Sequence, residues 1–469
     1  MGVSITLFVD NIVNIESYHL GLLKTLSLSI AVAVSAIPSI SNAAQRDSSS
    51  IAASNQQLNM LIEAALANDT ARSQYAAQSQ AMRESGIASA TQMDPKLKVG
   101  FGGLPVDSFK FDDDPMTNIS VGLMQQFERG SVLELNQRKA NQQAEGIAYQ
   151  IQVRERDVAN KVTQLWLELG YLQHVETLIK ENQSLMVEME RYVQTNYAVG
   201  KSEAQDLLNT QLQVSKIGEK LQSNQQMKTR LIAQLSEWLG DAWLNPSISK
   251  QASYQLDWQR LGSVLKDHTN TTQYYALLNE HPMARIADAN IFANRTQVEV
   301  AEQAYTPQFG VEMMYAYRQA DSMTGDPASD LLSAYVTMDI PLFTDSRQDK
   351  NLAAAQYQVG AAQYQKDTLL AQLNAQVNAL VIDRVNLAER IERYQDSLLP
   401  HATARIEAVE RGYQNNTAQF GDVITAATDE LALKIELSRL ITDLNQTNST
   451  LASLLGAFEY QVSTPKAQY

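Results

Sequence analysis

The stretch Tyr197–Gln211, with the sequence YAVGKSEAQDLLNTQ, interrupts a long run of polar, helix-favouring residues with a single glycine. A second stretch, YQNNTAQFGDVITAA at Tyr413–Ala427, interrupts a similar run 216 residues later. At this offset Asp206 aligns with Asp422, and the alignment continues without a gap through Gly240. Each stretch predicts a reversal between two helices, and together they predict a chain built from two repeats.

The rest of each repeat follows one order of elements: a helix, a strand, a loop, a strand, a very long helix, a turn and a returning helix. Upstream of the turns, the offset between aligned residues of the two repeats is 215, as for Val162 and Val377. Chance similarity between helical sequences of low complexity is the alternative. It does not account for strands, turns and helix ends that recur in one order.

The two very long helices are predicted at Ser131–Val199 and Ser346–Asn415, which are 69 and 70 residues long. A continuous helix of this length spans about 100 Å. Apolar residues recur in them every seven positions, a period typical of coiled coils. They are Ile151, Val158, Leu165, Leu172, Ile179, Met186 and Val193, then Leu373, Leu380, Leu387 and Tyr394, and Leu437, Leu444 and Leu451 on the last helix. These seams fit a wall of helices one layer thick, or an ordinary antiparallel bundle.

Four stretches alternate between apolar and mixed residues, as β-strands do. They are Lys96–Gly102, the stretch NISVGLMQQF that ends at Phe127, Phe309–Tyr317, and the stretch AYVTMDIPLF that ends at Phe343. They predict two hairpins with long polar loops, Leu104–Thr117 and Gln319–Leu332. Four strands cannot close a barrel, whereas three chains would supply twelve. Together with the signal peptide described below, the strands predict a transmembrane barrel that is shared between copies of the chain.

Charge and composition exclude several classes of protein. The net charge of −15 opposes nucleic-acid binding. Cysteine is absent, so we expect no disulfide, no thiolate metal site and no lipid-bearing cysteine. Lys24, the apolar segment after it, and the small residues Ser41 and Ala43 predict a signal peptide over residues 1–43. No later segment reaches about 18 uninterrupted apolar residues, so no transmembrane helix is expected.

The chain resembles the TolC family of outer-membrane efflux ducts over nearly all of its mature length. The resemblance rests on the duplicated layout, on the strand ends GLMQQFERGS and MDIPLFTDSR, and on the turns YAVGKSEAQDLL and YQNNTAQFGDVI. In the family, a tyrosine-x-x-glycine turn joins the long helices, and an aspartate followed by an aliphatic residue opens the returning helix. Here those pairs are Asp206–Leu207 and Asp422–Val423.

The resemblance implies a mainly α fold with a small β part. Very long coiled-coil helices would form a periplasmic α-barrel, and each chain would contribute four strands to a trimeric, twelve-stranded transmembrane β-barrel. It also implies a homotrimer in the cell outer membrane, in contact with outer-membrane lipid. Its partners would be a periplasmic adaptor (membrane-fusion) protein and an inner-membrane pump, docked at the helical tip. Neither a nucleic acid nor a cofactor is implied.

The implied function is a passive exit duct of a tripartite efflux pump. The stretches GGLPVDSF and DPMT resemble the branch of the family that serves heavy-metal cation pumps, so metal cations are the expected cargo and drugs or other small organic molecules the alternative. The chain departs from the family at Asn416, where the first turn has Gly200. It also has Asn209 and Thr425 where relatives often carry a second acidic residue.

The candidate gate at the periplasmic tip is formed by Asp206 and Asp422. In a trimer they would place six carboxylates around one axis, where their titration would be coupled. The local alternative is a helix start: Ser202 and Gln205 have the spacing of a capping box, and an acidic residue favours the first turn of a helix. The candidate tip turns, which the resemblance also assigns to adaptor docking, contain Gly200, Lys201, Ser202, Asn415, Asn416 and Thr417. Gly200 is expected to adopt a positive φ.

No motif for catalysis is present, so we expect no enzyme. The sequence contains no nucleophile elbow, P-loop, dinucleotide fingerprint or metalloprotease helix. No histidine is followed by a second ligand three or four positions later, and we expect no metal site. A soluble periplasmic coiled-coil scaffold or adaptor without a pore is the alternative from another functional class.

The sequence thus divides into nine segments. They are a signal peptide (1–43), N-terminal helices (44–94), a first barrel hairpin (95–128), a first long helix pair (129–240), an equatorial linker (241–275), the first helix of the second repeat (276–306), a second barrel hairpin (307–343), a second long helix pair (344–456) and a tail (457–469).

Overall fold

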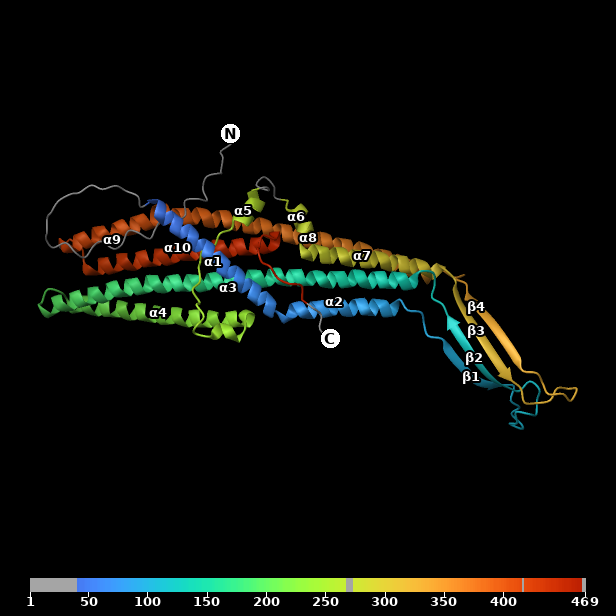
Figure 1. The fold of residues 1–469 in the computed structure, drawn as a ribbon. Coiled ribbons are helices and arrows are strands. Elements are labelled where there is room, and N and C mark those ends of the chain that lie inside the picture. Colours follow the sequence, from blue (N-terminus) through green and yellow to red (C-terminus); the bar gives the residue numbers. More distant parts are fainter. Residues whose placement is uncertain (1–39, 267–272, 416, 466–469) are drawn as a thin grey trace, which may run out of the picture. The chain divides into compact units, whose positions relative to one another are not determined.

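A computed structural model describes residues 40–266, 273–415 and 417–465, which form two compact units (Figure 1). One, which we call the tip unit, contains the chain up to Asp69 together with Glu155–Tyr274 and Ala375–Ser463. The other, the sheet unit, contains Thr70–Arg154, Tyr275–Asn374 and the end of the chain. Residues 1–39 of the predicted signal peptide lie outside the described residues.

Long helices and one sheet make up the described structure. The helices are α1 (Ile40–Asn68), α2 (Thr70–Ser89), α3 (Val132–Ala198), α4 (Ala204–Leu239), α5 (Gln259–Lys266), α6 (Tyr275–Asn279), α7 (Pro282–Glu302), α8 (Gln348–Arg393), α9 (Leu399–Gln414) and α10 (Phe420–Leu455). The strands are β1 (Lys96–Gly102), β2 (Asn118–Gln126), β3 (Gln308–Tyr317) and β4 (Leu331–Asp339). Within the described residues, no helix has both the length and the apolar character needed to cross a membrane.

The two returning helices match residue for residue. Helices α4 and α10 are both 36 residues long, and α10 begins and ends 216 residues after α4. Each is closed by a glycine with a positive φ, Gly240 at +77° and Gly456 at +70°. A residue with a side chain disfavours this backbone region, so glycine is the natural helix end. The offset predicted from the tip turns therefore holds along the whole helix.

The predicted seam of α3 is buried. All seven of its apolar residues, from Ile151 to Val193, expose 9% of their surface or less. In the tip unit, this face of α3 builds an apolar core with α1 and α4 in which Ile62, Leu66 and Trp166 are fully buried. Burial of such side chains stabilises each by about 1.5–3 kcal/mol. The coiled-coil prediction for this helix is confirmed.

The second very long helix is not continuous, as was predicted for Ser346–Asn415. A π-helical segment, Tyr394–Leu398, separates α8 from α9. Pro400 is the second residue of α9, and it has no backbone N–H to give to the carbonyl four residues before it. A π-helical turn contains one residue more than an α-helical turn. That extra residue accounts for the offset between the repeats, which rises from 215 upstream to 216 at the tip.

The seam shifts with the π-helix. A strict period of seven after Tyr394 would bring His401 and Ala408 into the seam, yet both are exposed. The half-buried residues are instead the next ones, Ala402 and Val409. One added residue has moved the seam by one position, which keeps the apolar side of α9 against its neighbour α10.

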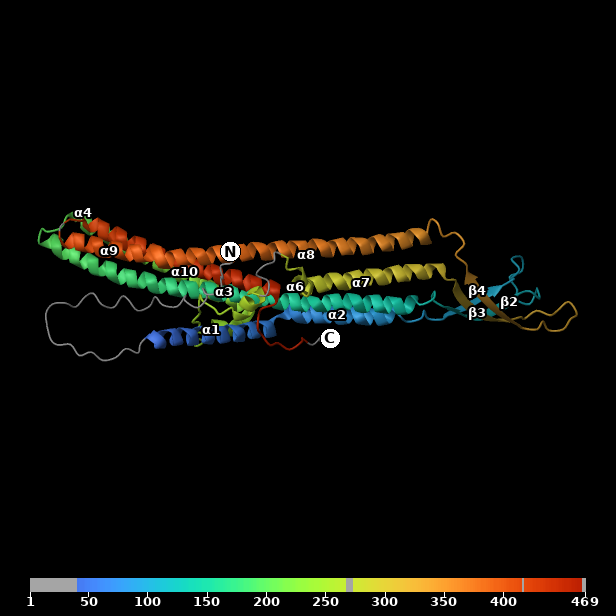
Figure 2. The ribbon, with the colours of Figure 1, turned by 90° about the horizontal axis from the view of Figure 1, so that it is seen from above.

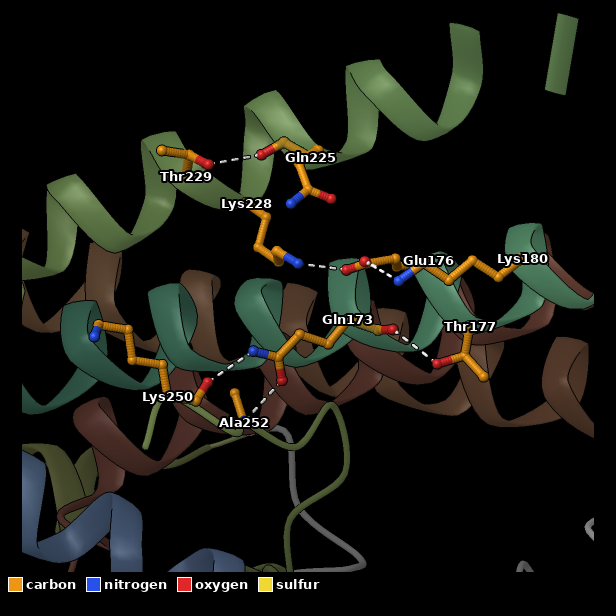
Figure 3. A network of polar contacts seen from close by, with 9 residues as sticks. All are labelled: Gln173, Glu176, Thr177, Lys180, Gln225, Lys228, Thr229, Lys250 and Ala252. Carbon is orange, nitrogen blue, oxygen red and sulfur yellow. Dashed lines mark hydrogen bonds and ion pairs between the residues drawn. The ribbon is translucent and has the colours of Figure 1, made fainter. Parts of the chain in front are cut away.

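A segment of the linker, residues 250–257, crosses the helices of the tip unit as an extended strap. The side-chain amide of Gln173 donates to the carbonyl of Lys250 (2.7 Å) and accepts from the N–H of Ala252 (2.9 Å), as Figure 3 shows. The strap passes so close to α3 that a Cβ on Gly170 would lie 2.3 Å from the carbonyl carbon of Ser253. Gly170 therefore makes room for the strap, and Gln173 holds it.

Two other amides hold the strap further along. The side-chain oxygen of Asn445 accepts from the N–H of Leu256 (3.2 Å) and from the indole of Trp258 (2.8 Å). Asn55 exchanges two hydrogen bonds with the backbone of Asp257, at 3.0 and 3.2 Å. Side chains thus supply the partners that the strap's backbone would otherwise find in a sheet.

The sheet unit contains one antiparallel sheet in the order β1-β2-β3-β4. The two predicted hairpins are present and joined, because β2 pairs with β3. The fourth strand was predicted to end at Phe343. In the structure it ends four residues earlier, at Asp339, and it begins at Leu331. Pro341 lacks the N–H that a longer strand would need. The side chain of Asp339 closes the strand by accepting from the N–H of Gln308 at 2.7 Å.

Candidate functional site

The first tip turn has the geometry expected of Gly200. Its φ is +73°, and its N–H donates to the carbonyl of Tyr197 at 3.0 Å. The next N–H, of Lys201, reaches back to the carbonyl of Asn196 at 2.7 Å. These bonds satisfy carbonyls at the end of α3 and reverse the chain within a few residues. The predicted positive φ is confirmed.

The second tip turn repeats this bond. The N–H of Thr417 donates to the carbonyl of Gly412 at 2.8 Å, and both residues lie 216 positions after their counterparts in the first turn. Asn415 ends α9 with a φ of −94°. Asn416, the predicted counterpart of Gly200, lies outside the described residues. The two reversals are therefore built alike where both are described.

The predicted capping box at the first returning helix is wrong. The residue that caps α4 is Glu203, without a side-chain hydrogen bond, so Ser202 and Gln205 do not cap the helix. The second helix does have a capping box: Gln419 and Asp422 cap each other's backbone N–H groups, with 3.0 Å from the Gln419 nitrogen to the Asp422 carboxylate. Asp206 and Asp422 both occupy the third position of their helices.

Ser202 is used elsewhere, because its hydroxyl is hydrogen-bonded to Tyr413 of the second repeat. The Tyr413 ring also packs edge-on against Tyr192 and Phe420, with centroids 6.4 and 5.5 Å apart. Burial, and then the nearby Tyr192 and Asp206, raise the pKa of Tyr413, and the bond to Ser202 offsets this in part. Tyr413 thus joins the tips of the two helix pairs, a role that its position in a turn motif did not reveal.

The two candidate gate residues differ in exposure. Asp206 is half-buried and Asp422 is exposed. Neither carboxylate forms an ion pair with another residue that the structure describes. Both aspartates therefore combine a local role at a helix start with a charge that remains available to its surroundings.

The first tip exposes more apolar surface than the second. Its exposed residues are Tyr197, Val199, Leu208 and Leu212. At the same positions of the second tip, Tyr413 is half-buried, Ile424 is buried, and Asn415 and Thr428 are polar. The repeats differ here although their backbones match.

An ion pair fixes α4 to α3 behind the tip. The carboxylate of Glu176 contacts Lys180 on the same helix, at 2.6 Å, and Lys228 on α4 (Figure 3). Burial works against the charge of this carboxylate, but the hydrogen bonds from the two lysines outweigh it and hold the pKa of Glu176 below its usual value. The pair keeps the two helices of the first repeat in register.

One face of the sheet is apolar across all four strands. Leu97, Leu123, Met313 and Ala334 lie in one row of paired residues, and Val99, Val121, Tyr315 and Leu332 lie in the next. Apart from Ala334, these side chains each expose 48% of their surface or more. No described element of the sheet unit covers them. A broad exposed apolar face marks a surface that is covered by another protein or by lipid.

The opposite face is polar and rich in small residues. Its rows contain Lys98, Gly122, Met314 and Ser333, and then Gly100, Ser120, Ala316 and Leu331. Lys98 forms an ion pair with Glu312 on this face at 2.6 Å. Among the described residues, the sheet thus has one apolar face and one polar face, and its first and last strands each pair on one side only.

Residues 273–457 match the family model described as outer membrane efflux protein. The matched residues contain the second repeat of the chain. The first repeat, which lies outside the matched residues, has the same elements in the same order. This match supports the resemblance over the second repeat and does not distinguish the heavy-metal branch. No curated protein matches the sequence.

Solved structures show the same fold over most of the chain. The outer membrane protein VceC of Vibrio cholerae is 18% identical, with a TM-score of 0.67 over 86% of this chain and 96% of that one. CusC is 14% identical, with a TM-score of 0.68 over 85% and 92%. The CmeC outer membrane channel of Campylobacter jejuni is 14% identical, with a TM-score of 0.65 over 87% of each.

The match over residues 273–457 agrees with the predicted location and class of function. The matched model describes proteins of the outer membrane that act in efflux. The long helices and the four-stranded sheet agree with the fold of the solved channels. In the part of the chain that the structure describes, no three His, Asp or Glu residues are grouped as metal ligands would be.

Proposed function

We propose that three copies of this efflux protein form the exit duct of a tripartite pump, with one shared barrel of twelve strands. The observation that carries the proposal is the sheet, which has one apolar face, one polar face and two unpaired edges. A strand edge left open in lipid has unsatisfied backbone groups, which only a closed barrel removes. Pairing β1 of one copy with β4 of the next satisfies both edges.

The direction of the two faces follows from this closure. The apolar face, with Val121 and Leu123, turns to lipid, and the polar face, with Ser120 and Lys98, turns to the water-filled interior. Cargo then passes along the polar face and into the helical tube. The duct itself supplies no energy, and the inner-membrane pump drives transport.

Two neighbouring positions on β2 test the barrel. A lysine facing lipid near mid-membrane costs about 2–4 kcal/mol, so Val121→Lys should reduce the yield of assembled trimer and the number of pores in a planar bilayer. Ser120→Lys on the other face should assemble and conduct. Mass measured by light scattering should equal three chains. A monomer that stays in the soluble fraction and gives no conductance would support the scaffold alternative and sink the proposal.

For the tip, we propose that Asp206 and Asp422 line the narrowest part of the duct. Their equivalent positions in the two repeats, and the lack of an ion pair to either one among the described residues, support a ring of six carboxylates. Replacing both with asparagine preserves size and removes the charge, and should lower the preference for cations measured from reversal potentials. An unchanged preference would leave the two residues with their helix-start roles alone.

The docking edge for a periplasmic adaptor is proposed at the turns, with Gly200, Lys201 and Ser202 on one side and Asn415, Asn416 and Thr417 on the other. The exposed apolar side chains of the first tip support this, because such surface marks interaction sites. Leu208→Asp with Leu212→Asp should abolish efflux in cells while the purified protein still conducts. Loss of conductance as well would indicate a folding defect instead.

Metal cations are the proposed cargo, on the strength of the GGLPVDSF and DPMT stretches and of the tip aspartates. Deletion of the gene should then sensitise the host to metal salts, and re-expression of the intact chain should restore resistance. Sensitivity to drugs with unchanged metal tolerance would favour organic cargo.

A further inference from the structure

We propose that the loop between β1 and β2, residues 103–117, inserts Val106 and Phe109 into the outer leaflet of the membrane. This inference rests on the membrane barrel proposed above, and it adds a lipid contact that lies beyond the barrel wall. It is carried by an apolar surface that continues from the sheet onto the loop, and by a strained phenylalanine that the loop leaves exposed.

The loop lies at the end of the sheet away from the helices. Along the chain β1 follows α2 and β3 follows α7, and both helices lie at the opposite end of the strands (Figures 1 and 2). In a barrel whose helices extend into the periplasm, the loop end of the strands reaches the outer surface of the membrane. Outer-leaflet lipid is therefore the apolar phase nearest to the loop.

The apolar face of the sheet reaches the base of this loop. Its last row of paired residues contains Phe101 of β1, Ile119 of β2 and Tyr317 of β3. These side chains expose 64%, 44% and 49% of their surface. Phe101 points to the same side as Leu97 and Val99, because alternate residues of a strand share a face. The face proposed to contact lipid thus ends in large apolar side chains beside the loop.

The loop continues this apolar face. The ring of Phe111 packs edge-on against the ring of Phe101, with the centroids 5.7 Å apart and the planes at 78°. Since Phe101 belongs to the apolar face, the contact places Phe111 on that side of the sheet. Two apolar side chains that precede it in the loop are open to the surroundings, because Phe109 exposes 69% of its surface and Val106 exposes 82%.

The loop holds Phe109 in an uncommon backbone conformation. Its φ is +52°, and no other residue with a side chain has a positive φ in the part of the chain that the structure describes. Its N–H donates to the carbonyl of Pro105 at 3.0 Å and closes a turn. A bulky residue in this region is strained. Most of the ring is uncovered by the chain, so burial in lipid is the contact that would offset the strain.

The base of the loop is fixed to both hairpins. The hydroxyl of the buried Thr117 donates to the carbonyl of Gly103 at 2.8 Å and joins the two ends of the loop. The guanidinium of Arg318, which follows β3, donates to the carbonyl of Pro115 at 3.3 Å. These bonds restrain the loop where it leaves the sheet. Its apolar side chains are therefore presented at the membrane surface by an ordered segment.

The charges of the loop indicate which part of the lipid it contacts. One lysine and four aspartates give residues 103–117 a net charge of −3; they are Lys110, Asp107, Asp112, Asp113 and Asp114. Anionic headgroups repel such a loop. Contact with the acyl chains therefore holds it, and insertion should not require anionic lipid.

The absence of cysteine allows one label at a time. The full-length protein carries Phe109→Cys, labelled with a polarity-sensitive fluorophore, in nanodiscs of zwitterionic phosphatidylcholine, which leave both membrane surfaces open to solvent. Lipid with a nitroxide near the headgroup end of its acyl chains should quench this label. Burial about 5–10 Å into the headgroup boundary should make iodide quenching at least about threefold weaker than for Asp113→Cys. Asp113 is the control, since it is exposed on the same loop.

A third label, at Val121→Cys on the apolar face of β2, separates this inference from the barrel. Equal iodide quenching of Phe109→Cys and Asp113→Cys, with Val121→Cys quenched by lipid, would overturn the loop contact and leave the barrel intact. Iodide quenching of all three would overturn both. A label at Phe109→Cys that neither quencher reaches would show that the loops of the copies meet over the mouth of the barrel, which also excludes insertion into lipid.

A second readout removes the ring and leaves the label elsewhere. With the label at Val106→Cys, Phe109→Gly accepts the positive φ without strain. Loss of the buried ring should raise iodide quenching of this label by about twofold or more. Phe109→Leu keeps an apolar side chain and should leave the quenching unchanged. Equal quenching in the glycine and leucine variants would contradict an anchor at Phe109.

Discussion

The ring of Tyr413 lies edge-on to the ring of Tyr192, with their centroids 6.4 Å apart and their planes at 74°. One residue belongs to the second repeat and the other to the first, so this contact joins the two helix pairs at the tip. Since Tyr413 also binds Ser202 beside the first turn, one side chain connects both reversals.

Truncating this side chain should loosen the tip. Tyr413→Ala removes both ring contacts and the hydrogen bond, and should cost about 2 kcal/mol of local stability. The amides of Lys201 and Thr417 should then exchange their hydrogens on the order of thirtyfold faster. Tyr413→Phe keeps the rings and should change the exchange much less. Equal protection in the alanine variant and the parent would show that the tips are held together by other contacts.

Replacing each of the two aspartates at the helix starts with alanine should destabilise the two helices by different amounts. Asp422→Ala breaks a capping box and should destabilise the start of α10 by about 1 kcal/mol. Asp206→Ala removes a side chain from a helix whose cap makes no side-chain hydrogen bond, so only the smaller interaction with the helix dipole is lost, a few tenths of a kcal/mol. Hydrogen exchange in the first turns of α4 and α10 measures both, and equal losses would contradict the capping geometry.

The Glu176 ion pair should make stability depend on acid pH. Its pKa in the folded protein lies below the usual 4.5. The ionised carboxylate therefore stabilises the fold at pH values above the usual pKa, and this contribution is lost as pH falls through the folded pKa. Glu176→Gln should melt below the parent at neutral pH, and the two curves should converge in acid. The control is Glu188→Gln, at an exposed position of α3 without an ion pair to any described residue; a similar pH-dependent gap there would exclude the lysine contacts as the cause.

Two glycines in helices should respond oppositely to alanine. At Gly170 the new Cβ would lie 2.3 Å from the carbonyl carbon of Ser253, so the strap must move, at about 1–3 kcal/mol. At Gly218 nothing lies within 4 Å, and the lower backbone entropy of alanine should stabilise α4 by about 0.5–1 kcal/mol. Thermal melting followed by circular dichroism compares them, and a tolerated Gly170→Ala would mean that the strap does not press on α3.

The structural features that the sequence predicts best are those whose residues recur at a regular spacing. The seam of α3 follows from a period of seven, and the turn at Gly200 follows from a glycine between two such runs. Both depend on residues close together in the chain. The partner of Ser202 is different, because Tyr413 lies 211 positions away and a local pattern favours the nearer helix start.

The same limit applies at the end of β4 and in the second long helix. Pro341 marks the end of that strand, but its start at Leu331 depends on pairing with Ala316 across the sheet. The change of the offset between the repeats from 215 to 216 shows that the second repeat has one added residue. It does not show whether that residue lies in a loop or in a helix. Only the structure places it at Tyr394–Leu398.

The position of the π-helical segment, Tyr394–Leu398, bears on how the two repeats came to differ in length. Inserting a codon into a rod-like helix turns every later side chain by about 100°, which would point the far half of the wall in the wrong direction. Here the added residue lies in a single π-helical turn. The tip of the second repeat therefore keeps the same orientation as the tip of the first. A repeat protein of this kind can change in length by single residues and still present two matching ends.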